Sequence, residues 1–257
     1  MANASAATRA LGALRIMAKS AGPITAAAIA QRLDMPRSST YHLLKAMEVE
    51  GYVIHYPQDS RWGLGISAFE LGQAYLRHDP LERLARPILA KLVHEVERQL
   101  PAIGHLAILH GTDALYLLRE LPRRPVQAVT EVGVRLPGHL TASGRAILAQ
   151  LPPAQIKALY AGQTELVNRT GLGPKNVTEL VQQLTADRQA GNSMEDGFIT
   201  DGLSGVSVAV LDRLKLPVAA LNLTFNTAQA TPEIKQRMAT ALTAAANQLS
   251  RSLGHHD

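Results

Sequence analysis

Six polar or amphipathic side chains occur in a row at residues 37–42, directly after a proline, and a lysine follows at position 45. Hydroxyl, guanidinium and imidazole groups can hydrogen-bond to base edges in a DNA major groove and to phosphate oxygens. Ser and Thr are also common in the first turn of an ordinary solvated helix, so this run alone favours neither interpretation. The residues are Arg37, Ser38, Ser39, Thr40, Tyr41, His42 and Lys45.

The sequence GHLTASGRAIL, residues 138–148, is a second candidate site. Small residues lead into a predicted helix, whose first amides and positive dipole end favour an anionic ligand. The hydroxyl groups of Thr141 and Ser143 can add to such a site. Capping of the helix by Ser143 is the alternative, and the two roles are compatible.

Polar residues interrupt one face of a predicted strand in VAALNLTF. Asn222 and Thr224 are two positions apart and therefore share a face, whereas Leu221, Leu223 and Phe225 share the other. This alternation is typical of a polar pocket wall and equally of a half-exposed sheet.

The elements around residues 37–45 predict a winged helix-turn-helix. Apolar periodicity and capping residues predict helices at 8–18, from Thr25 to Leu33 and from about Pro36 to Glu50. A hairpin follows at 52–64, with Trp62 expected in its core. Arg61, near the wing tip, is either a contact to phosphate or the minor groove or an ordinary surface arginine. In this motif the start of the recognition helix, here the helix from about Pro36 to Glu50, enters the major groove. This strengthens the DNA interpretation of residues 37–45.

The rest of the chain predicts an α+β domain, in which helices flank a mostly antiparallel sheet. A helix capped by Asp79 and Pro80 runs to about Gln99, and a last helix runs from Thr231 to about Leu253. Strands are predicted at 102–110, 114–121, 126–137, 205–212 and 217–225, and helices at 143–151, 153–160 and 176–190.

Composition limits the class of protein. The 257 residues favour two domains, and 46% apolar residues allow a packed core. The absence of cysteine excludes disulfides, thiolate nucleophiles and thiolate metal sites. No signal peptide and no run of about 20 apolar residues is present, so we expect a cytoplasmic protein without a membrane span. The net charge of +5 is compatible with a nucleic-acid partner but does not establish one.

The chain resembles the IclR family of bacterial transcriptional regulators. GPITAAAIAQRLDMPRSSTYHLLKAMEVEGYV, LGISAFELGQAYL, LARPILAKLVHEV and HLTASGRAILAQLP occur in the family's order, and the similarity runs from about Ala7 to Ser250. The resemblance implies a DNA-binding winged helix-turn-helix domain at 1–65, a linker helix at 66–78 and a GAF-like effector-binding domain at 79–257. It also implies a homodimer or dimer of dimers on double-stranded operator DNA, with helix 1 and the linker helix pairing the DNA-binding domains.

The same resemblance assigns effector contacts. It places the effector against amides of the loop before the helix predicted at 143–151. It also places it against the paired strands predicted at 205–212 and 217–225 and against the acidic loop that precedes them. These residues, with the Thr141 hydroxyl, are Ala142, Ser143, Gly144, Glu195, Asp196, Gly205, Ser207, Asn222 and Thr224. Phe198 and Gly205 replace more polar family residues, which predicts a more apolar pocket and an organic or aromatic acid as effector.

Two alternatives remain open. A hydrolase-like enzyme would use Ser143, although the chain has no G-x-S-x-G, H-E-x-x-H, P-loop or G-x-G-x-x-G motif. Apart from the adjacent pair His255 and His256, the histidines show no ligand spacing, so no metal or cofactor is expected. A winged helix that binds a protein instead of DNA is the other alternative.

Overall fold

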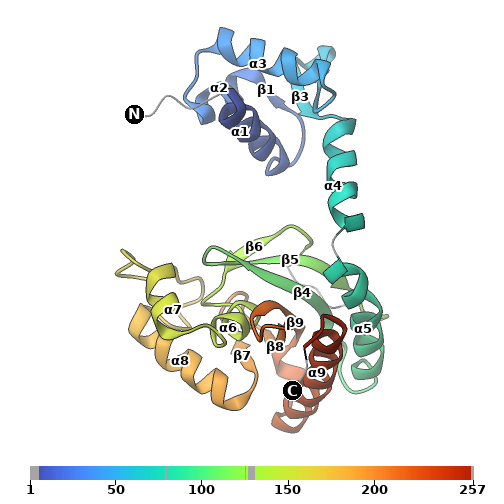
Figure 1. Cartoon of the computed structure of the whole chain (residues 1–257), viewed down its shortest axis with the longest axis vertical. Coiled ribbons are helices and arrows are strands. Elements are labelled where there is room, and N and C mark those ends of the chain that lie inside the picture. The colour runs from blue at the N-terminus through green and yellow to red at the C-terminus, as the bar shows by residue number, and fades with distance from the viewer. Residues whose placement is uncertain (1–5, 79, 125, 127–130, 256–257) are drawn as a thin grey trace. The chain divides into compact units, whose positions relative to one another are not determined.

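The computed structural model describes residues 6–78, 80–124, 126 and 131–255, except for the side chains of residues 73–78 and 80. Its contacts divide the chain into two compact units, Met1–Asp79 and Pro80–Asp257. Figure 1 shows the two units, and each is described by itself.

The first unit is a winged helix-turn-helix. It contains α1 (Ala6–Ala18), β1 (Ile24–Thr25), α2 (Ala26–Leu33), α3 (Arg37–Val49), β2 (Val53–Tyr56), a short 3-10 turn (Pro57–Asp59), β3 (Arg61–Leu64) and α4 (Ile66–His78). The strands form an antiparallel sheet in the order β1-β3-β2. β1 was not predicted, because two residues are too few to show an alternation.

Local capping explains the turn between α2 and α3. The Thr25 hydroxyl accepts a hydrogen bond from the amide of Ala28 (3.3 Å) and starts α2. Asp34 ends α2 in a left-handed conformation (φ 51°), and Pro36 occupies the position before α3. The chain therefore reverses within three residues, 34–36, between the two helices.

Trp62 lies at the centre of the first unit's core. It is 1% exposed and packs with Leu44, Met47 and Val53, so the prediction of a hairpin-core tryptophan is confirmed. Burying an aromatic side chain of this size is a large part of what a small domain can gain from its core.

The second unit is built on a six-stranded antiparallel sheet in the order β6-β5-β4-β9-β8-β7. The strands are β4 (Ile103–His110), β5 (Asp113–Glu120), β6 (Arg135–Pro137), β7 (Ser193–Asp196), β8 (Leu203–Leu211) and β9 (Pro217–Asn226). The helices are α5 (Pro80–Val96), α6 (Ala142–Leu148), α7 (Pro153–Leu159), α8 (Val177–Ala190) and α9 (Pro232–Ser252).

The helices divide between the two faces of this sheet (Figure 1). α5 and α9 cover one face, where Leu221, Leu223 and Phe225 are buried among their apolar side chains. α6 packs on the other face, and α7 and α8 pack around it through the apolar cluster that includes Leu148 and Leu180. Asn222 and Thr224 face the α6 side, so the predicted alternation along this strand is confirmed.

Two strand predictions need correction. β7 was missed because its four residues follow directly on a helix. Among the described residues of the strand predicted at 126–137, strand structure is confined to Arg135–Pro137, and the chain turns at Gly133, where φ is 83°. Residues 125 and 127–130 and the predicted cap Asp79 lie outside the described residues.

Candidate functional site

The start of α3 presents a polar surface. Arg37, Ser38, Ser39, Tyr41, His42 and Lys45 are exposed. Tyr41 is 44% exposed although its ring stands edge-on to that of Trp62, at 5.8 Å between centroids. These side chains can reach an external partner.

Thr40 is an exception and corrects the prediction that it faces DNA. Its side chain is fully buried, and its hydroxyl donates to the carbonyl of Pro36 (3.1 Å). Position 40 shares the buried stripe of α3 with Leu44 and Met47, which lie four and seven residues later. Thr40 therefore belongs to the buried face of α3 and not to the surface that can touch DNA.

Lys45 is fixed in place on the exposed face. Its ammonium lies 2.8 Å from Glu48 Oε2 and 5.5 Å from the centroid of the Trp62 ring. The hydrogen bond from Lys45 lowers the pKa of Glu48, and Glu48 also accepts from the amide of His55 (3.3 Å). The hydrogen bond between Glu48 and His55 links α3 to β2. The ion pair with Glu48 holds the Lys45 ammonium beside Tyr41.

Arg61 belongs to a basic cluster that the sequence did not reveal. Its guanidinium donates to the carbonyl of Pro23 (2.9 Å) and lines an open cleft of about 550 Å³ together with Lys19, Arg32 and Asp59. The cations come from three distant parts of the sequence, so no local charge run marks them. Clustered cations of this kind suit a phosphate backbone.

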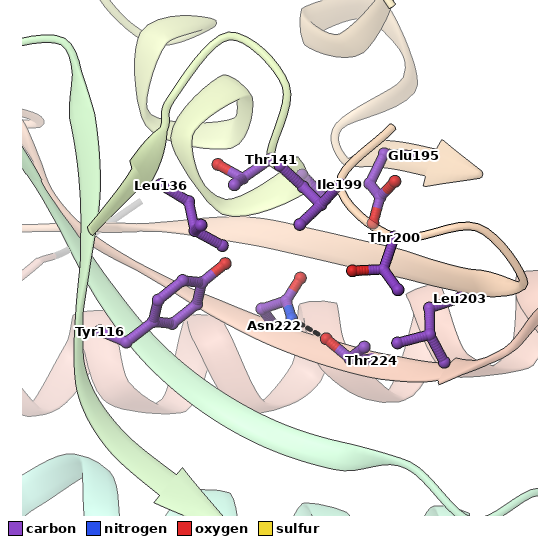
Figure 2. Close-up of a pocket in the computed structure, with 10 residues that line it drawn as sticks. Tyr116, Leu136, Thr141, Glu195, Ile199, Thr200, Leu203, Asn222 and Thr224 are labelled. Carbon is purple, nitrogen blue, oxygen red and sulfur yellow. Dashed lines mark hydrogen bonds between the residues drawn. The ribbon is translucent and has the colours of Figure 1, made fainter. Parts of the chain in front are cut away.

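The second unit contains a small cavity between its sheet and α6 (Figure 2). Its volume is about 30 Å³, room for one or two water molecules. The lining mixes apolar side chains with hydroxyl, amide and carboxyl groups. It consists of Tyr116, Leu136, Thr141, Ala142, Glu195, Ile199, Thr200, Leu203, Asn222 and Thr224.

Strand register brings the polar lining together. Glu195 of β7 pairs with Gly205 of β8, which pairs with Thr224 of β9, so the three positions form one row across the sheet. A Cβ atom on Gly205 would lie 3.2 Å from Glu195 Oε1, so the glycine leaves room for the carboxyl group above the sheet. Asn222 donates to Thr224 Oγ1 (2.9 Å) within the same wall.

Glu195 is the acidic group of the cavity. It is 8% exposed, and its Oε2 accepts from the amide of Phe198 (2.8 Å). Burial raises the pKa of Glu195 to about 7, because removal from water disfavours the charged form more than the Phe198 amide and Arg145 favour it.

Five predicted effector residues line this cavity: Thr141, Ala142, Glu195, Asn222 and Thr224. The other lining residues, Tyr116, Leu136, Ile199, Thr200 and Leu203, were missed, because β5, β6 and the β7–β8 loop reach the site only through the tertiary fold. Aliphatic side chains form part of this lining, but Phe198, on which the expectation of a more apolar pocket partly rested, packs elsewhere, with its ring 5.2 Å from the Arg145 guanidinium carbon.

The remaining predicted effector residues are not part of the cavity wall. Ser207 donates to the carbonyl of Leu221 (2.7 Å), and Gly205 lies beneath Glu195. Asp196 is bound instead by Lys235 (2.7 Å) and the Ser204 hydroxyl (2.6 Å). The side chains of Ser207 and Asp196 thus have structural partners, and their predicted effector contacts stay predictions.

Gly144 and Ser143 have structural partners. The Gly144 amide, predicted as an effector donor, donates instead to the capping hydroxyl of Thr141 (2.9 Å). A Cβ atom on Gly144 would clash with the backbone of Gly138, so the residue permits a close approach of two segments. The Ser143 hydroxyl is buried 3.3 Å from that of Tyr116. Thr141 is thus the cap of α6, and the predicted cap Ser143 is not.

Arg145 ties the site together and was also missed. It is fully buried, and its guanidinium donates to Asp187 Oδ2 (2.9 Å), to the carbonyl of Leu140 (3.3 Å) and to the carbonyl of Met194. These bonds connect α6 with α8 and with β7 next to Glu195. No short-range pattern marks this pair, because Asp187 lies 42 residues away.

Two loops close the cavity. The roof segment, residues 197–202, supplies Ile199 and Thr200 to the lining. The strap, residues 166–175, is closed by a hydrogen bond from the Leu166 amide to the Lys175 carbonyl (2.8 Å). The Thr170 hydroxyl donates to Gly197 O (2.7 Å) and the Arg169 guanidinium to Ile199 O (3.2 Å), so the strap holds the roof by its backbone.

The surroundings of Ser143 do not favour hydrolysis. A serine nucleophile needs an adjacent base, and the partner of Ser143 is the Tyr116 hydroxyl, whose pKa burial raises to about 12. Among the described residues, no group of three His, Asp or Glu side chains is placed to hold a metal ion. Within the same residues, no helix is both long and apolar enough to cross a bilayer.

An apolar groove of about 440 Å³ lies on the first unit, between α1, α3 and α4. Leu11 of α1 and Leu71 of α4 line it and are each 59% exposed. Phe69, on α4, is 61% exposed. Exposed apolar surface of this extent is typical of a protein contact.

Comparison with known proteins places both units in one family. The model described as "Bacterial transcriptional regulator IclR C-terminal" matches residues 73–251, and "IclR helix-turn-helix domain" matches residues 6–55. The Pca regulon regulatory protein of Pseudomonas putida is 30% identical over 236 residues, which cover 90% of this chain and 77% of that protein. The transcriptional repressor AllR of Klebsiella pneumoniae is 26% identical over 257 residues, covering 98% and 90%.

Solved structures show the same fold. An IclR transcriptional regulator from Alicyclobacillus acidocaldarius superposes with a TM-score of 0.84 at 21% identity, covering 97% of this chain and 98% of that one. An IclR homolog from Microbacterium hydrocarbonoxydans, complexed with 4-hydroxybenzoate, gives 0.80 at 22% identity, covering 97% and 99%. Since the C-terminal family model alone spans more than half of the sequence, the chain belongs to the IclR family of bacterial transcriptional regulators.

Proposed function

We propose that this regulator binds operator DNA through residues 1–65 and a small organic acid through residues 79–257, with residues 66–78 as the linker. The observation that carries the proposal is the combination, in one chain, of an exposed polar α3 on a winged helix-turn-helix with a small cavity of mixed polarity. Family membership supports the same division of labour.

DNA is read by the exposed residues of α3. Arg37, Ser38, Ser39, Tyr41, His42 and Lys45 face the major groove, and Arg61 with Lys19 and Arg32 holds the phosphate backbone. Thr40 is excluded by its burial. Action on chromosomal operators places the protein in the cytoplasm.

The effector occupies the cavity under the roof segment. We assign it to the class of organic or aromatic acids, supported by the family and by the relative that binds 4-hydroxybenzoate. Its carboxylate lies near the amides of Ala142 and Ser143, which belong to the first turn of α6, where amides lack helical partners. Because the cavity holds only about 30 Å³, the roof must move to admit such a molecule.

A second copy of the chain covers the apolar groove of α1, α3 and α4. The groove places exposed leucines beside small alanines, as a helix contact between copies requires. Two paired units present two α3 helices to a palindromic or repeated operator. The effector changes operator affinity if it binds two arrangements of the pair with different affinity.

Selection of bound sequences from random DNA, followed by a screen of organic acids that release or tighten the complex, tests the proposal. Operator affinity should fall steeply with salt, because phosphate contacts release counterions. Flat salt dependence would favour a protein partner for the winged helix. Unchanged operator discrimination in both Ser39→Ala and Tyr41→Ala would show that α3 is not the reading surface.

A further inference from the structure

We infer that the effector is a hydroxylated acid whose hydroxyl group donates a hydrogen bond to the carboxylate of Glu195. This inference rests on the proposed function of the cavity and specifies the chemistry of its ligand. It makes Glu195 the residue that distinguishes a hydroxy acid from the same acid without the hydroxyl group.

Glu195 is held in a fixed position at the cavity wall. The Phe198 amide binds Oε2 (2.8 Å), and the absent side chain of Gly205 lets Oε1 lie above the sheet. Figure 2 shows the carboxyl group facing the same space as Thr200, Asn222 and Thr224. A ligand in that space meets a carboxylate oxygen.

Several donors of the cavity wall are directed to other acceptors. The Asn222 amide donates to Thr224 Oγ1 (2.9 Å), and the Tyr116 and Ser143 hydroxyls share a hydrogen bond (3.3 Å). The Gly144 amide donates to the Thr141 hydroxyl oxygen, and the Thr141 hydroxyl donates to Gly138 O (3.4 Å). A ligand hydroxyl is therefore well matched to Glu195.

The charges around the cavity exclude a ligand carboxylate at this end. None of the ten lining residues is Lys, Arg or His. Arg145, the cation whose field reaches Glu195, already donates to Asp187, Leu140 and Met194. Two carboxylates in contact in a poorly solvated space repel each other, so the acid group of the ligand belongs at the α6 end.

Titration of Glu195 supports the same geometry. Burial raises the pKa of Glu195 to about 7, and the charged or titratable groups coupled to it are Arg145 of α6, Asp196 of β7 and Tyr116 of β5. A ligand hydroxyl stabilises the ionised carboxylate. A ligand without a donor leaves that carboxylate desolvated, so its binding favours the protonated form and takes up a proton.

The test uses matched acids and the full-length protein. Isothermal calorimetry with benzoate and 4-hydroxybenzoate, and with phenylacetate and 4-hydroxyphenylacetate, measures what the hydroxyl contributes in wild-type protein and in Glu195→Gln. We expect the wild type to prefer the hydroxy acid of at least one pair on the order of 10-fold, the effect of a hydrogen bond to a charged group. Glu195→Gln should weaken the hydroxy acid and strengthen its unhydroxylated partner.

In Glu195→Gln, opposite changes in affinity for the two acids of a pair would indicate lost recognition of the hydroxyl group. General damage to the cavity would weaken the binding of both acids. Glu165→Gln is the matched control, because Glu165 is exposed and is not part of the cavity lining. It should retain the preference. A preference that Glu195→Gln leaves unchanged, or no preference among acids that bind, would overturn the inference and leave the proposed function standing.

The pH dependence of wild-type binding is an independent check that needs no variant. Between pH 6 and 8, affinity for the unhydroxylated acid should fall as the pH rises through the pKa of Glu195, near 7, whereas affinity for the hydroxy acid should not fall. Parallel pH profiles for both acids would contradict the inference. If none of the four acids binds at any pH, the effector is not an aromatic acid of this size, and this inference falls while an aliphatic organic acid still fits the proposed function.

Discussion

Adjacent hydroxyl residues of α3 have opposite surroundings. Ser39 is exposed, whereas Thr40 is buried and bound to Pro36 O. The sequence contains the information for this difference, because positions 40, 44 and 47 follow helical spacing and share a face with the core. A run of polar residues identifies a functional helix, but only helical periodicity identifies which of them can touch DNA.

Arg37 is the exposed cation at the start of α3, and its replacement tests DNA contact directly. We expect Arg37→Gln to lower operator affinity on the order of 10-fold, as measured by fluorescence anisotropy. Arg213→Gln, an exposed arginine in the β8–β9 turn, is the control and should leave affinity unchanged. Loss restricted to the selected operator indicates a base contact, whereas equal loss on all sequences with a reduced salt slope indicates a phosphate contact. Unaltered binding would remove Arg37 from the interface.

Gly144 shows how a residue assigned to ligand binding can instead be required by packing. We expect Gly144→Ala to reduce the free energy of unfolding by about 3 kcal/mol, because a methyl group would clash with the Gly138 backbone. Urea denaturation followed by circular dichroism measures this. Gly72→Ala in α4 is the control, since nothing lies within 4 Å of its added Cβ. Equal stability of the two variants would show that the Gly138–Gly144 approach is not tight.

At the scale of elements, local patterns predicted the long helices and strands but not the way the cavity closes. Strands β4, β5, β8 and β9 have clear alternation or buried runs, and caps mark α8 and α9. The roof segment and strap have no such signal, because their contacts join residues about 30 positions apart through backbone carbonyls. Arg145 and Asp187 are invisible to local patterns for the same reason.

The strap should control how readily the roof segment opens. Thr170→Val removes the hydrogen bond to Gly197 O, worth about 1 kcal/mol, so amide exchange in residues 197–202 should become roughly 5-fold faster. Hydrogen exchange with mass spectrometry measures this. Thr164→Val, an exposed position before the strap, should have no effect. Unchanged exchange in Thr170→Val would mean that the strap does not restrain the roof.

At the scale of the whole molecule, regulation requires that effector binding and DNA binding influence each other. The resemblance of the sequence to a known family predicted both units and their order, and the family models confirm that family. The spacing of apolar residues in the sequence could not predict the apolar groove as a binding surface, because an apolar stripe on α1 is equally typical of a helix packed in a core. Only the structure shows that Leu11 remains 59% exposed.

Leu11 offers a test of pairing. We expect Leu11→Glu to lower the affinity for a two-fold operator roughly tenfold while leaving a half-site fragment unaffected, because the introduced charge would be buried between copies. Competition binding on the two DNA fragments measures the difference, and sedimentation reports the assembly state. Val167→Glu, at an exposed residue of the strap, is the control. Equal losses on both fragments would indicate damage to the DNA-binding unit instead of loss of pairing.

The opposite faces of the six-stranded sheet differ in how they are packed. The face under α5 and α9 is a close-packed interior, whereas Ile199 and Thr200 project from a roof that the strap grips by backbone carbonyls. Replacing the side chains of Ile199 and Thr200 leaves the hydrogen bonds from the strap in place, because these bonds end on backbone carbonyls. Exchanges at these two positions should therefore change which acids the proposed effector cavity accepts, at little cost to the scaffold.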